Sequence, residues 1–251
     1  MKDATTSSLE LLWGTGERPS RGPKPGLTLD RIVTAAVGVA DTEGLDAVSM
    51  RRVATELGVG TMSLYRYVPG KTELLDLMLD RVQGESFEDG PEIPTHWRDT
   101  VEQLARSYRE LYQAHPWLLR VNQARSVLGP SALRGLELCL SGLKGPHGMG
   151  LSDPETIGVI ISVQSYVAGV ARMEIQAAEA AKETGVDDEE FWRGQQPFLE
   201  RAMASGDYPH MAALAEDTFS RDFDHFAFGL ERLLDGFEAL VSGGAGGASR
   251  R

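Results

Sequence analysis

The stretch VATELGVGTMSLYRYVPGKTEL (Val53–Leu74) predicts two short helices joined by a tight glycine turn, followed by a second turn into a longer helix. Gly58 stands where a residue with positive φ ends the first helix, a conformation that glycine adopts without steric cost. The second helix, Thr61–Tyr67, is too short to be stable in isolation, and Leu64 is its core anchor. This stretch therefore predicts a small helical unit that must pack on its neighbours.

The other side of the Thr61–Tyr67 helix carries polar, aromatic and cationic side chains and no carboxylate. Such a surface suits a DNA groove. Lys71 opens the next helix, so its ammonium lies beside free backbone N–H groups, an arrangement that favours a phosphate. We expect groove contacts from Thr61, Met62, Ser63 and Arg66, and phosphate contacts from Tyr65, Tyr67 and Lys71. Ser49, the expected cap of the preceding helix, and Arg51 on its outer face complete the predicted DNA-binding set.

The longer segment LTLDRIVTAAVGVADTEGLDAVSMRRVATELGVGTMSLYRYVPGKTELL, which begins at Leu27, resembles the N-terminal DNA-binding domain of TetR-family (tetracycline-repressor-family) transcriptional regulators. The similarity extends without a gap from Leu27 to about Val82 and includes the motif A-x-x-L-G-V-x-x-x-x-L-Y-x-Y-V-x-x-K-x-x-L. A helical bundle whose turn merely imitates this motif is the alternative, but it does not explain the absence of acids from the exposed side of the short helix. The resemblance implies a helix-turn-helix domain followed by a helical domain for ligand binding and dimerisation.

The formal net charge of −12 argues against a nucleic-acid partner until its distribution is considered. Residues 18–71 hold 8 lysines and arginines against 5 aspartates and glutamates, whereas residues 84–251 hold 15 against 26. The charge at the contact face, rather than the total charge, decides phosphate binding. The positive region coincides with the predicted helix-turn-helix.

Apolar residues recur at helical spacing along the chain without a convincing strand, so we predict an all-α fold. Residues 1–26 are rich in Ser, Gly, Pro and Arg and are predicted to form a flexible basic arm, either a plain leader or a segment that follows the minor groove. Residues 27–83 form the predicted three-helix DNA-binding domain with the helix that follows it. Residues 84–242 form the larger ligand-binding and dimerisation domain, and residues 243–251 a flexible tail.

Capping residues and prolines indicate where individual helices begin. Thr28 is expected to cap the first helix of the DNA-binding domain. Asp153 is expected to cap the longest helix, with Pro154 at its first position. Pro197 is expected to kink or split the helix predicted over 187–204.

The resemblance also implies a small-molecule pocket in the C-terminal domain, and aromatic and polar residues among apolar ones are its natural wall positions. Each such residue is alternatively a satisfied core or surface residue. The candidates are Trp97, Tyr108, His115, Trp117, Asn122, Gln164, Tyr166, Arg172 and Glu174. Gln164 and Arg172 stand out because they interrupt an apolar helix and need partners if buried. The segment AHPWLLRVNQARSVLGP lacks the histidine-arginine pattern with which tetracycline repressors hold a magnesium-chelated drug, so we expect neither tetracycline nor a metal.

The last predicted helix, Phe223–Leu240, has a broader apolar face than one neighbouring helix can cover. It resembles the last helix of tetracycline-repressor-like C-terminal domains, which pairs with the long helix of both subunits in a four-helix dimer interface. A two-fold dimer is also expected because helix-turn-helix proteins bind two half-sites about one helical turn apart. We therefore expect a homodimer through Phe223–Leu240 and the long helix that begins near Asp153, with an ordinary core helix as the alternative.

Catalytic and metal-binding patterns are not evident in the sequence. None of the five histidines has the spacing of a helical metal pair, and Cys139 lies on an apolar helix face. No apolar run is long enough for a membrane span and no export signal is evident, which favours the cytoplasm. We predict a non-enzymatic, cofactor-free regulator that binds double-stranded operator DNA, in particular a repressor released by a small hydrophobic molecule. A DNA-binding regulator without a ligand and an all-α enzyme are the alternatives.

Overall fold

The structure is a computed structural model of the 251-residue chain, of which residues 4–14, 26–85, 94–121, 127–215, 218 and 223–244 are described. The smaller of two helical bodies comprises α1 (Ala4–Leu12), α2 (Leu29–Glu43), η1 (Leu45–Ala47), α3 (Met50–Glu56), α4 (Thr61–Leu64) and α5 (Lys71–Glu85). The larger comprises α6 (Trp97–Ala114), η2 (Pro116–Arg120), α7 (Pro130–Lys144), α8 (Asp153–Thr184), α9 (Asp188–Ala204), α10 (Pro209–Ala212) and α11 (His225–Gly244). The described residues contain no strand, which confirms the predicted all-α fold.

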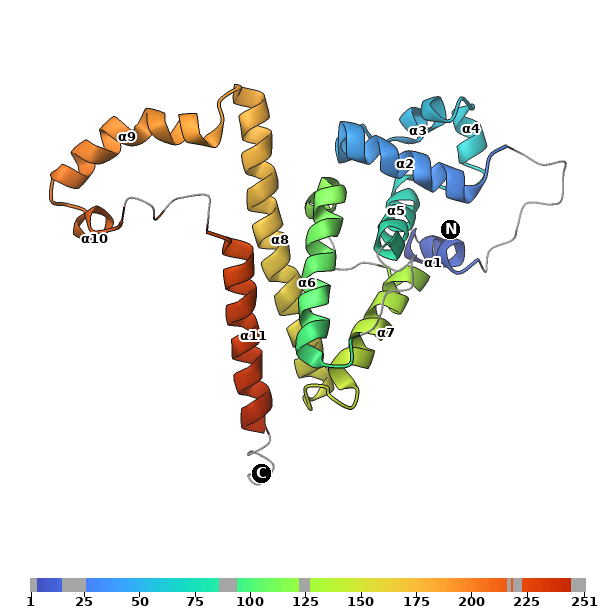
Figure 1. Ribbon diagram of the computed structural model, residues 1–251. Helices are drawn as coiled ribbons and strands as arrows, with labels where there is room; N and C mark the ends of the chain where they lie inside the picture. Colours follow the sequence, from blue (N-terminus) through green and yellow to red (C-terminus); the bar gives the residue numbers. More distant parts are fainter. Residues whose placement is uncertain are drawn as a thin grey trace.

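The two bodies meet where α5 packs against α7 and where η2 packs against α2, and Figure 1 shows α5 between α2 and α7. α5 packs against α1 and α2 on one side and against α7 on the other. In the larger body α6 packs along α8, and α11 lies beside both of these helices. α9 and α10 extend away from the end of α8 and contact mainly each other (Figure 1).

The helix ends of the smaller body follow from local sequence. Thr28 Oγ1 accepts a hydrogen bond from Arg31 N at 3.1 Å, and Ser49 Oγ accepts one from Arg52 N at 3.1 Å, so both predicted caps are confirmed. Gly58 has φ +67, as its predicted role at the end of α3 requires.

The helix predicted over Thr61–Tyr67 is shorter than expected, because α4 ends at Leu64. The next three residues form a turn in which the N–H groups of Tyr67 and Val68 both donate to the Leu64 carbonyl, at 2.8 and 2.9 Å. This turn directs Leu64 and Val68 into the core, where both are fully buried. Burial of two anchors, rather than continuation of the helix, decides the local conformation.

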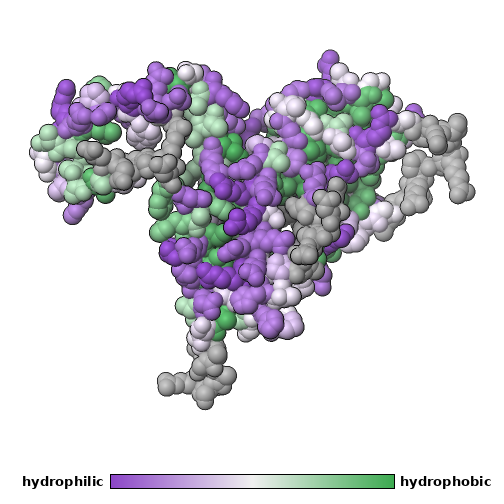
Figure 2. Space-filling model, in the orientation of Figure 1, coloured by the Kyte–Doolittle hydropathy of each residue, from purple (hydrophilic) through white to green (hydrophobic). Residues whose placement is uncertain are grey.

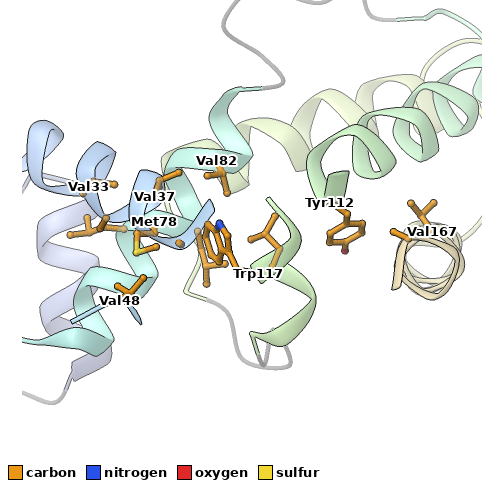
Figure 3. Packing of buried hydrophobic residues seen from close by; sticks show 14 of the residues in the cluster. Val33, Val37, Val48, Met78, Val82, Tyr112, Trp117 and Val167 are labelled. Atoms are coloured by element: carbon orange, nitrogen blue, oxygen red, sulfur yellow. The ribbon is translucent and has the colours of Figure 1, made fainter. Parts of the chain in front are cut away.

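The hydrophobic core is continuous between the two bodies. Figure 3 shows a row of buried side chains that leads from Val37 and Met78 through Trp117 and Tyr112 to Val167 in α8. Trp117 is 2% exposed and fills the position where the smaller body meets η2. The two bodies therefore pack as one unit rather than as independent domains on a linker.

The predicted flexible arm is wrong for Ala4–Leu12, which forms α1 and packs against α5. Ser8 is fully buried, and its Oγ donates to Asp76 Oδ2 at 2.5 Å. Trp13 Nε1 donates to the carbonyl of Leu128 at 3.3 Å, which ties the end of α1 to the segment before α7. So short a helix depends on the surface that α5 offers, which the local sequence does not reveal. Residues 15–25 of the predicted arm lie outside the described residues.

The cap of α8 is one residue earlier than predicted. Ser152 and Glu155 form a capping box, in which Ser152 N donates to Glu155 Oε2 at 2.9 Å. Asp153 is instead the first helical residue, where its negative charge complements the helix dipole.

Two other predicted boundaries also change. Pro197 lies inside α9, which is one helix over its whole length, so the predicted split does not occur. α11 extends to Gly244, so the first two residues of the predicted tail are helical. The rest of the tail, 245–251, lies outside the described residues.

Among the described residues, α8 alone has the length and apolar composition of a membrane span. Core helices of soluble proteins pass the same test, and α8 packs against α6, α7, η2 and α11. Only 28% of its apolar window is buried inside this chain. α8 therefore retains an apolar face that the isolated chain leaves uncovered.

Deletion of residues 2–13 is expected to lower the thermal unfolding midpoint, because it exposes the face of α5 that α1 covers. Loss of the partly buried Leu11 and Leu12 and of the Ser8 contact corresponds to about 2 kcal/mol. For a chain of this size that loss is a decrease of about 4–8 °C. Differential scanning calorimetry measures it, with deletion of residues 245–251 as the control. A midpoint equal to that of the intact chain would contradict the docking of α1.

Candidate DNA-binding surface and internal cavity

α3 and α4 pack as a helix-turn-helix with a short connection. Gly58 N donates to Thr55 O at 3.1 Å and Val59 N donates to Ala54 O at 3.0 Å, which closes the end of α3. Leu64 then holds α4 against the core with 0% exposure. The geometry leaves one side of α4 facing solvent.

That exposed side carries most of the predicted DNA contacts. Met62 is 74% exposed and Tyr65 is 45% exposed, Arg66 is exposed, and Thr61 and Ser63 are half-buried beside them. α4 itself contains no carboxylate. The surface combines hydrogen-bonding, apolar and cationic groups, which base edges and phosphates require.

Cations near α4 differ in whether they are already paired. Arg52 donates to Glu43, with Nη2 and Oε1 2.5 Å apart, and to Glu56, with Nη1 and Oε2 2.9 Å apart. These hydrogen bonds raise the pKa of the Arg52 guanidinium and hold that of Glu43 below its usual range. Within the described residues, Arg51 and Lys71 are exposed and form no ion pair, so their charges face solvent.

Two members of the predicted DNA-binding set serve the fold itself. Ser49 Oγ is occupied by its cap on α3. Tyr67 is half-buried, and its hydroxyl donates to the Leu27 carbonyl at 3.1 Å, so its one proton is used inside the domain. Ser49 therefore stabilises the start of α3, and Tyr67 connects the turn after α4 to the start of the domain.

A cavity of about 420 Å³ lies between α5, α6, α7 and α8. Its walls are mainly apolar, with Leu104, Leu111, Leu136 and Ile160 among them. The polar wall residues are Gln83, Thr100, Gln103, Ser107, Tyr108, Ser131 and Gln164. Among the described wall residues there is no acid, lysine, arginine or histidine.

Burial keeps the weak acids in the wall neutral. It raises the pKa of the Tyr108 phenol to about 12 and that of the Cys139 thiol to about 11. Tyr108 also stacks on Tyr112, with ring centroids 6.2 Å apart. The cavity therefore presents uncharged hydrogen-bonding groups in an apolar setting.

Of the nine predicted pocket residues, the structure places Tyr108 and Gln164 in the cavity wall. Trp97, His115 and Trp117 are buried in the core away from the cavity, the last two where the two bodies meet. Asn122 lies outside the described residues. Helical spacing thus predicts correctly that α6 and α8 line the cavity. It does not predict which side of each helix faces the cavity.

The remaining three candidates contact other elements. The Tyr166 hydroxyl lies 2.9 Å from the Phe226 carbonyl of α11, and the two rings stack. Arg172 donates to the Leu119 carbonyl at 3.4 Å, and Glu174 pairs with Arg109 at 2.6 Å. These residues join α8 to α6, η2 and α11 rather than lining the cavity.

The wall formed by α7 was missing from the sequence prediction. It includes Ser131, Ala132, Leu136 and Cys139. The last three follow the spacing of one helix face, a signal that is visible in the sequence but does not distinguish a cavity wall from a closed core. From the sequence, Cys139 is therefore expected only to lie on an apolar helix face.

Asp80 connects α5 to the start of α7 by hydrogen bonds beside the cavity. It is 8% exposed, and its Oδ1 accepts from the backbone N–H groups of Ser131 and Ala132, each at 3.1 Å. A Cβ on Gly129 would lie 2.2 Å from this oxygen, so only glycine allows so close an approach. The carboxylate thus caps the first turn of α7 from a different helix.

The fold and these two sites define a class of protein, a helix-turn-helix DNA-binding protein with a helical sensing domain. Residues 32–78 match the family model described as bacterial regulatory proteins, tetR family. Residues 90–241 match the tetracyclin repressor-like, C-terminal domain. The chain therefore belongs to the tetR family of regulators, which confirms the resemblance seen in the sequence.

Named relatives agree with this assignment. The HTH-type transcriptional repressor DrrR1 of Streptomyces coeruleorubidus is 59% identical, over 94% of this chain and 86% of that protein. ActR from Streptomyces coelicolor in complex with actinorhodin is 31% identical with a TM-score of 0.68, covering 86% of this chain and 97% of that one. Apo ActR is 32% identical with a TM-score of 0.67, covering 88% and 100%.

Replacement of Asp80 by alanine is expected to destabilise the protein by about 2 kcal/mol, because two partly buried N–H groups at the start of α7 lose their acceptor. The thermal midpoint should fall by about 4–8 °C. Asp80→Asn keeps an acceptor oxygen and should lose clearly less. Calorimetry on both variants tests the interaction, and equal losses would show that the acceptor is not the stabilising feature.

Proposed function

We propose that this protein is a ligand-responsive transcriptional repressor that binds operator DNA as a cytoplasmic homodimer and leaves it when a small molecule occupies the cavity. One observation carries the proposal: α5 begins in the DNA-binding domain, after the turn that follows α4, and near its end Gln83 lines a cavity whose described wall carries no charge. The same helix therefore borders both sites. A ligand can shift DNA affinity only by preferring one of two arrangements of such shared elements.

In the proposed complex, α4 enters the major groove. Thr61, Met62, Ser63 and Arg66 contact base edges, while Arg51, Tyr65 and Lys71 contact phosphates. The exposure of Met62 and Tyr65 and the unpaired state of Arg51 and Lys71 support this arrangement. Ser49 and Tyr67 contribute through the hydrogen bonds that hold α3 and α4 in place.

The proposed effector is an uncharged, largely apolar molecule with hydrogen-bonding groups. A buried charge needs a partner of opposite sign, and the wall residues that the structure describes supply none. Tyr108 and Gln164 are the proposed hydrogen-bonding partners on α6 and α8, and Ser131 on α7. The structural relative ActR binds actinorhodin, which supports a small-molecule role for the equivalent domain here.

The proposed dimer interface is formed by α8 and α11. Met173 on α8 and Phe228 and Leu240 on α11 are between 44% and 65% exposed in the single chain. Figure 2 shows hydrophobic residues on the side of the molecule where α8, α9 and α11 lie. A second copy related by a two-fold axis would cover these side chains and set the spacing of two α4 helices.

The DNA-binding half is tested by an electrophoretic shift with the DNA upstream of the gene itself, against an unrelated fragment of equal length. The protein is expected to bind its own upstream fragment more tightly. Lys71→Ala should weaken binding to both fragments and reduce the slope of log affinity against log salt by about one. Lys182→Ala, which removes an exposed lysine in the last turn of α8, is the matched control. Equal affinity for the two fragments would contradict specific binding, and an unchanged slope would remove the Lys71 contact.

The cavity is tested with two fluorescent probes, uncharged N-phenyl-1-naphthylamine and its anionic relative 8-anilino-1-naphthalenesulfonate. The uncharged probe is expected to bind more tightly, because the described part of the wall holds no cation to pair with a sulfonate. Ala132→Phe places a ring inside the cavity and should weaken the uncharged probe by about tenfold or more. Leu133→Phe changes the next residue, which is exposed and outside the wall, and serves as the control. Equal effects of the two variants would contradict binding in the cavity.

A further inference from the structure

His115 lies between two carboxylates that come from different helices. Its Nδ1 is 2.8 Å from Asp41 Oδ1 on α2, and its Nε2 is 3.0 Å from Glu85 Oε2 at the end of α5. The imidazole side chain is 8% exposed, whereas those of Asp41 and Glu85 are 28% and 42% exposed. The imidazole thus connects the two carboxylates by two hydrogen bonds, at the place where the two bodies meet.

The geometry defines the protonation state of the imidazole. An ionised carboxylate accepts hydrogen bonds and has no proton to donate. Both ring nitrogens of His115 must therefore carry a proton for both bonds to exist, which makes the ring an imidazolium. A neutral ring has one N–H and can keep only one of the two bonds.

The surroundings of the ring favour that charge. Burial alone would lower the pKa of His115, but the hydrogen bonds to Asp41 and Glu85 outweigh it and raise the pKa above its ordinary value. From η2, the neighbouring Trp117 donates its Nε1–H to the same Asp41 Oδ1 at 2.7 Å. The next charged pair, Arg120 with Asp46, joins η2 to η1 at 2.7 Å but is largely exposed and contributes little.

His115 also lies at the end of a cavity-lining helix. α6 contributes Gln103, Ser107, Tyr108 and Leu111 to the cavity wall. His115 N donates to the Leu111 carbonyl at 2.9 Å and is the C-terminal cap residue of α6. A displacement of α6 by an occupant of the cavity would thus act directly on the position of the imidazolium.

We propose that His115 is a coupling residue, whose imidazolium joins α2 and α5 of the DNA-binding domain to the cavity-lining helix α6 and makes operator affinity depend on its charge. This inference rests on the proposed function and adds to it a second connection, separate from the direct contact of α5 with the cavity. Asp41 and Glu85 supply the paired charges. Trp117 fixes the Asp41 carboxylate and fills the core beneath it.

The proposal fixes the sign of a pH dependence. Because the folded-state pKa of His115 is raised, the interaction stabilises the folded protein fully below the unfolded value of about 6.5. The stabilisation is lost as the pH rises through the folded-state pKa, where one of the two hydrogen bonds disappears. The interaction of His115 with Asp41 and Glu85 therefore stabilises the contact between the two bodies more in mildly acidic than in mildly alkaline solution.

The test compares the intact chain with His115→Gln and with His210→Gln, a control that removes an exposed histidine on α10. Thermal unfolding and affinity for the upstream DNA fragment are measured at about pH 6 and about pH 8.5, on either side of the histidine range, at constant ionic strength. The midpoint of the intact chain should exceed that of His115→Gln more at the lower pH. Relative to His115→Gln, its DNA affinity should change by about threefold or more between the two pH values. His210→Gln should behave as the intact chain.

A second variant separates charge from shape. Asp41→Asn keeps an oxygen that can accept from His115 and Trp117 but removes the negative charge. The pKa of His115, followed by NMR of its ring protons, should lie above the ordinary value in the intact chain and fall in Asp41→Asn. This measurement requires neither DNA nor a folded His115→Gln protein. If Asp41 only packed against His115, its replacement by asparagine would leave the pKa of His115 unchanged.

The outcomes distinguish the two proposals. Parallel pH profiles for the intact chain and His115→Gln, or a His115 pKa that Asp41→Asn leaves unchanged, would overturn the role of His115. Failure of every variant to prefer the upstream DNA would overturn the proposed function. In that case the unfolding and NMR measurements still decide whether the imidazolium fastens the two bodies together.

Discussion

The burial of α5 on several sides is the constraint on which the rest of the structure depends. Leu74 and Met78 are fully buried in the core of the DNA-binding domain, while Asp76 and Asp80 make hydrogen bonds to α1 and to the start of α7. A helix satisfies its backbone internally and moves nearly as a rigid body. Any displacement that the cavity imposes on α5 must therefore be accommodated by α2, α4 and α1 together.

The two sites use opposite electrostatic conditions. The α4 surface is exposed, and among the described residues Arg51 and Lys71 form no ion pair, so water solvates their charges. The described wall of the cavity consists of apolar and uncharged polar side chains, which offer no counter-ion to a buried charge. Between them, charges occur in paired form, as His115 with Asp41 and Glu85, where burial is tolerable only because each group has a partner. The net charge of −12 therefore says little about either site.

The capping and turn predictions from the sequence are correct where a residue acts on its immediate neighbours. Thr28, Ser49 and Gly58 perform the predicted capping and turn roles because these depend on bonds within three or four residues. The cap of α8 was placed one residue late, since Ser152 and Asp153 are both acceptable caps and only the pairing with Glu155 distinguishes them. The sequence does not predict α1 because its stability comes from contact with α5, where the partner of Ser8 is 68 residues further along the chain.

The sequence by itself determined the family, the all-α fold, the helix-turn-helix and the side of α4 that faces outward. These features follow from helical periodicity and from turn chemistry, which are local. Only the tertiary structure decided which faces of α6, α7 and α8 meet around a cavity, and that Tyr108 and Gln164 line it while Tyr166 and Glu174 do not. The same holds for His115, whose partners are 74 and 30 residues away. Helical spacing fixes the faces of each helix, but the rotation and crossing of packed helices decide which face meets which partner.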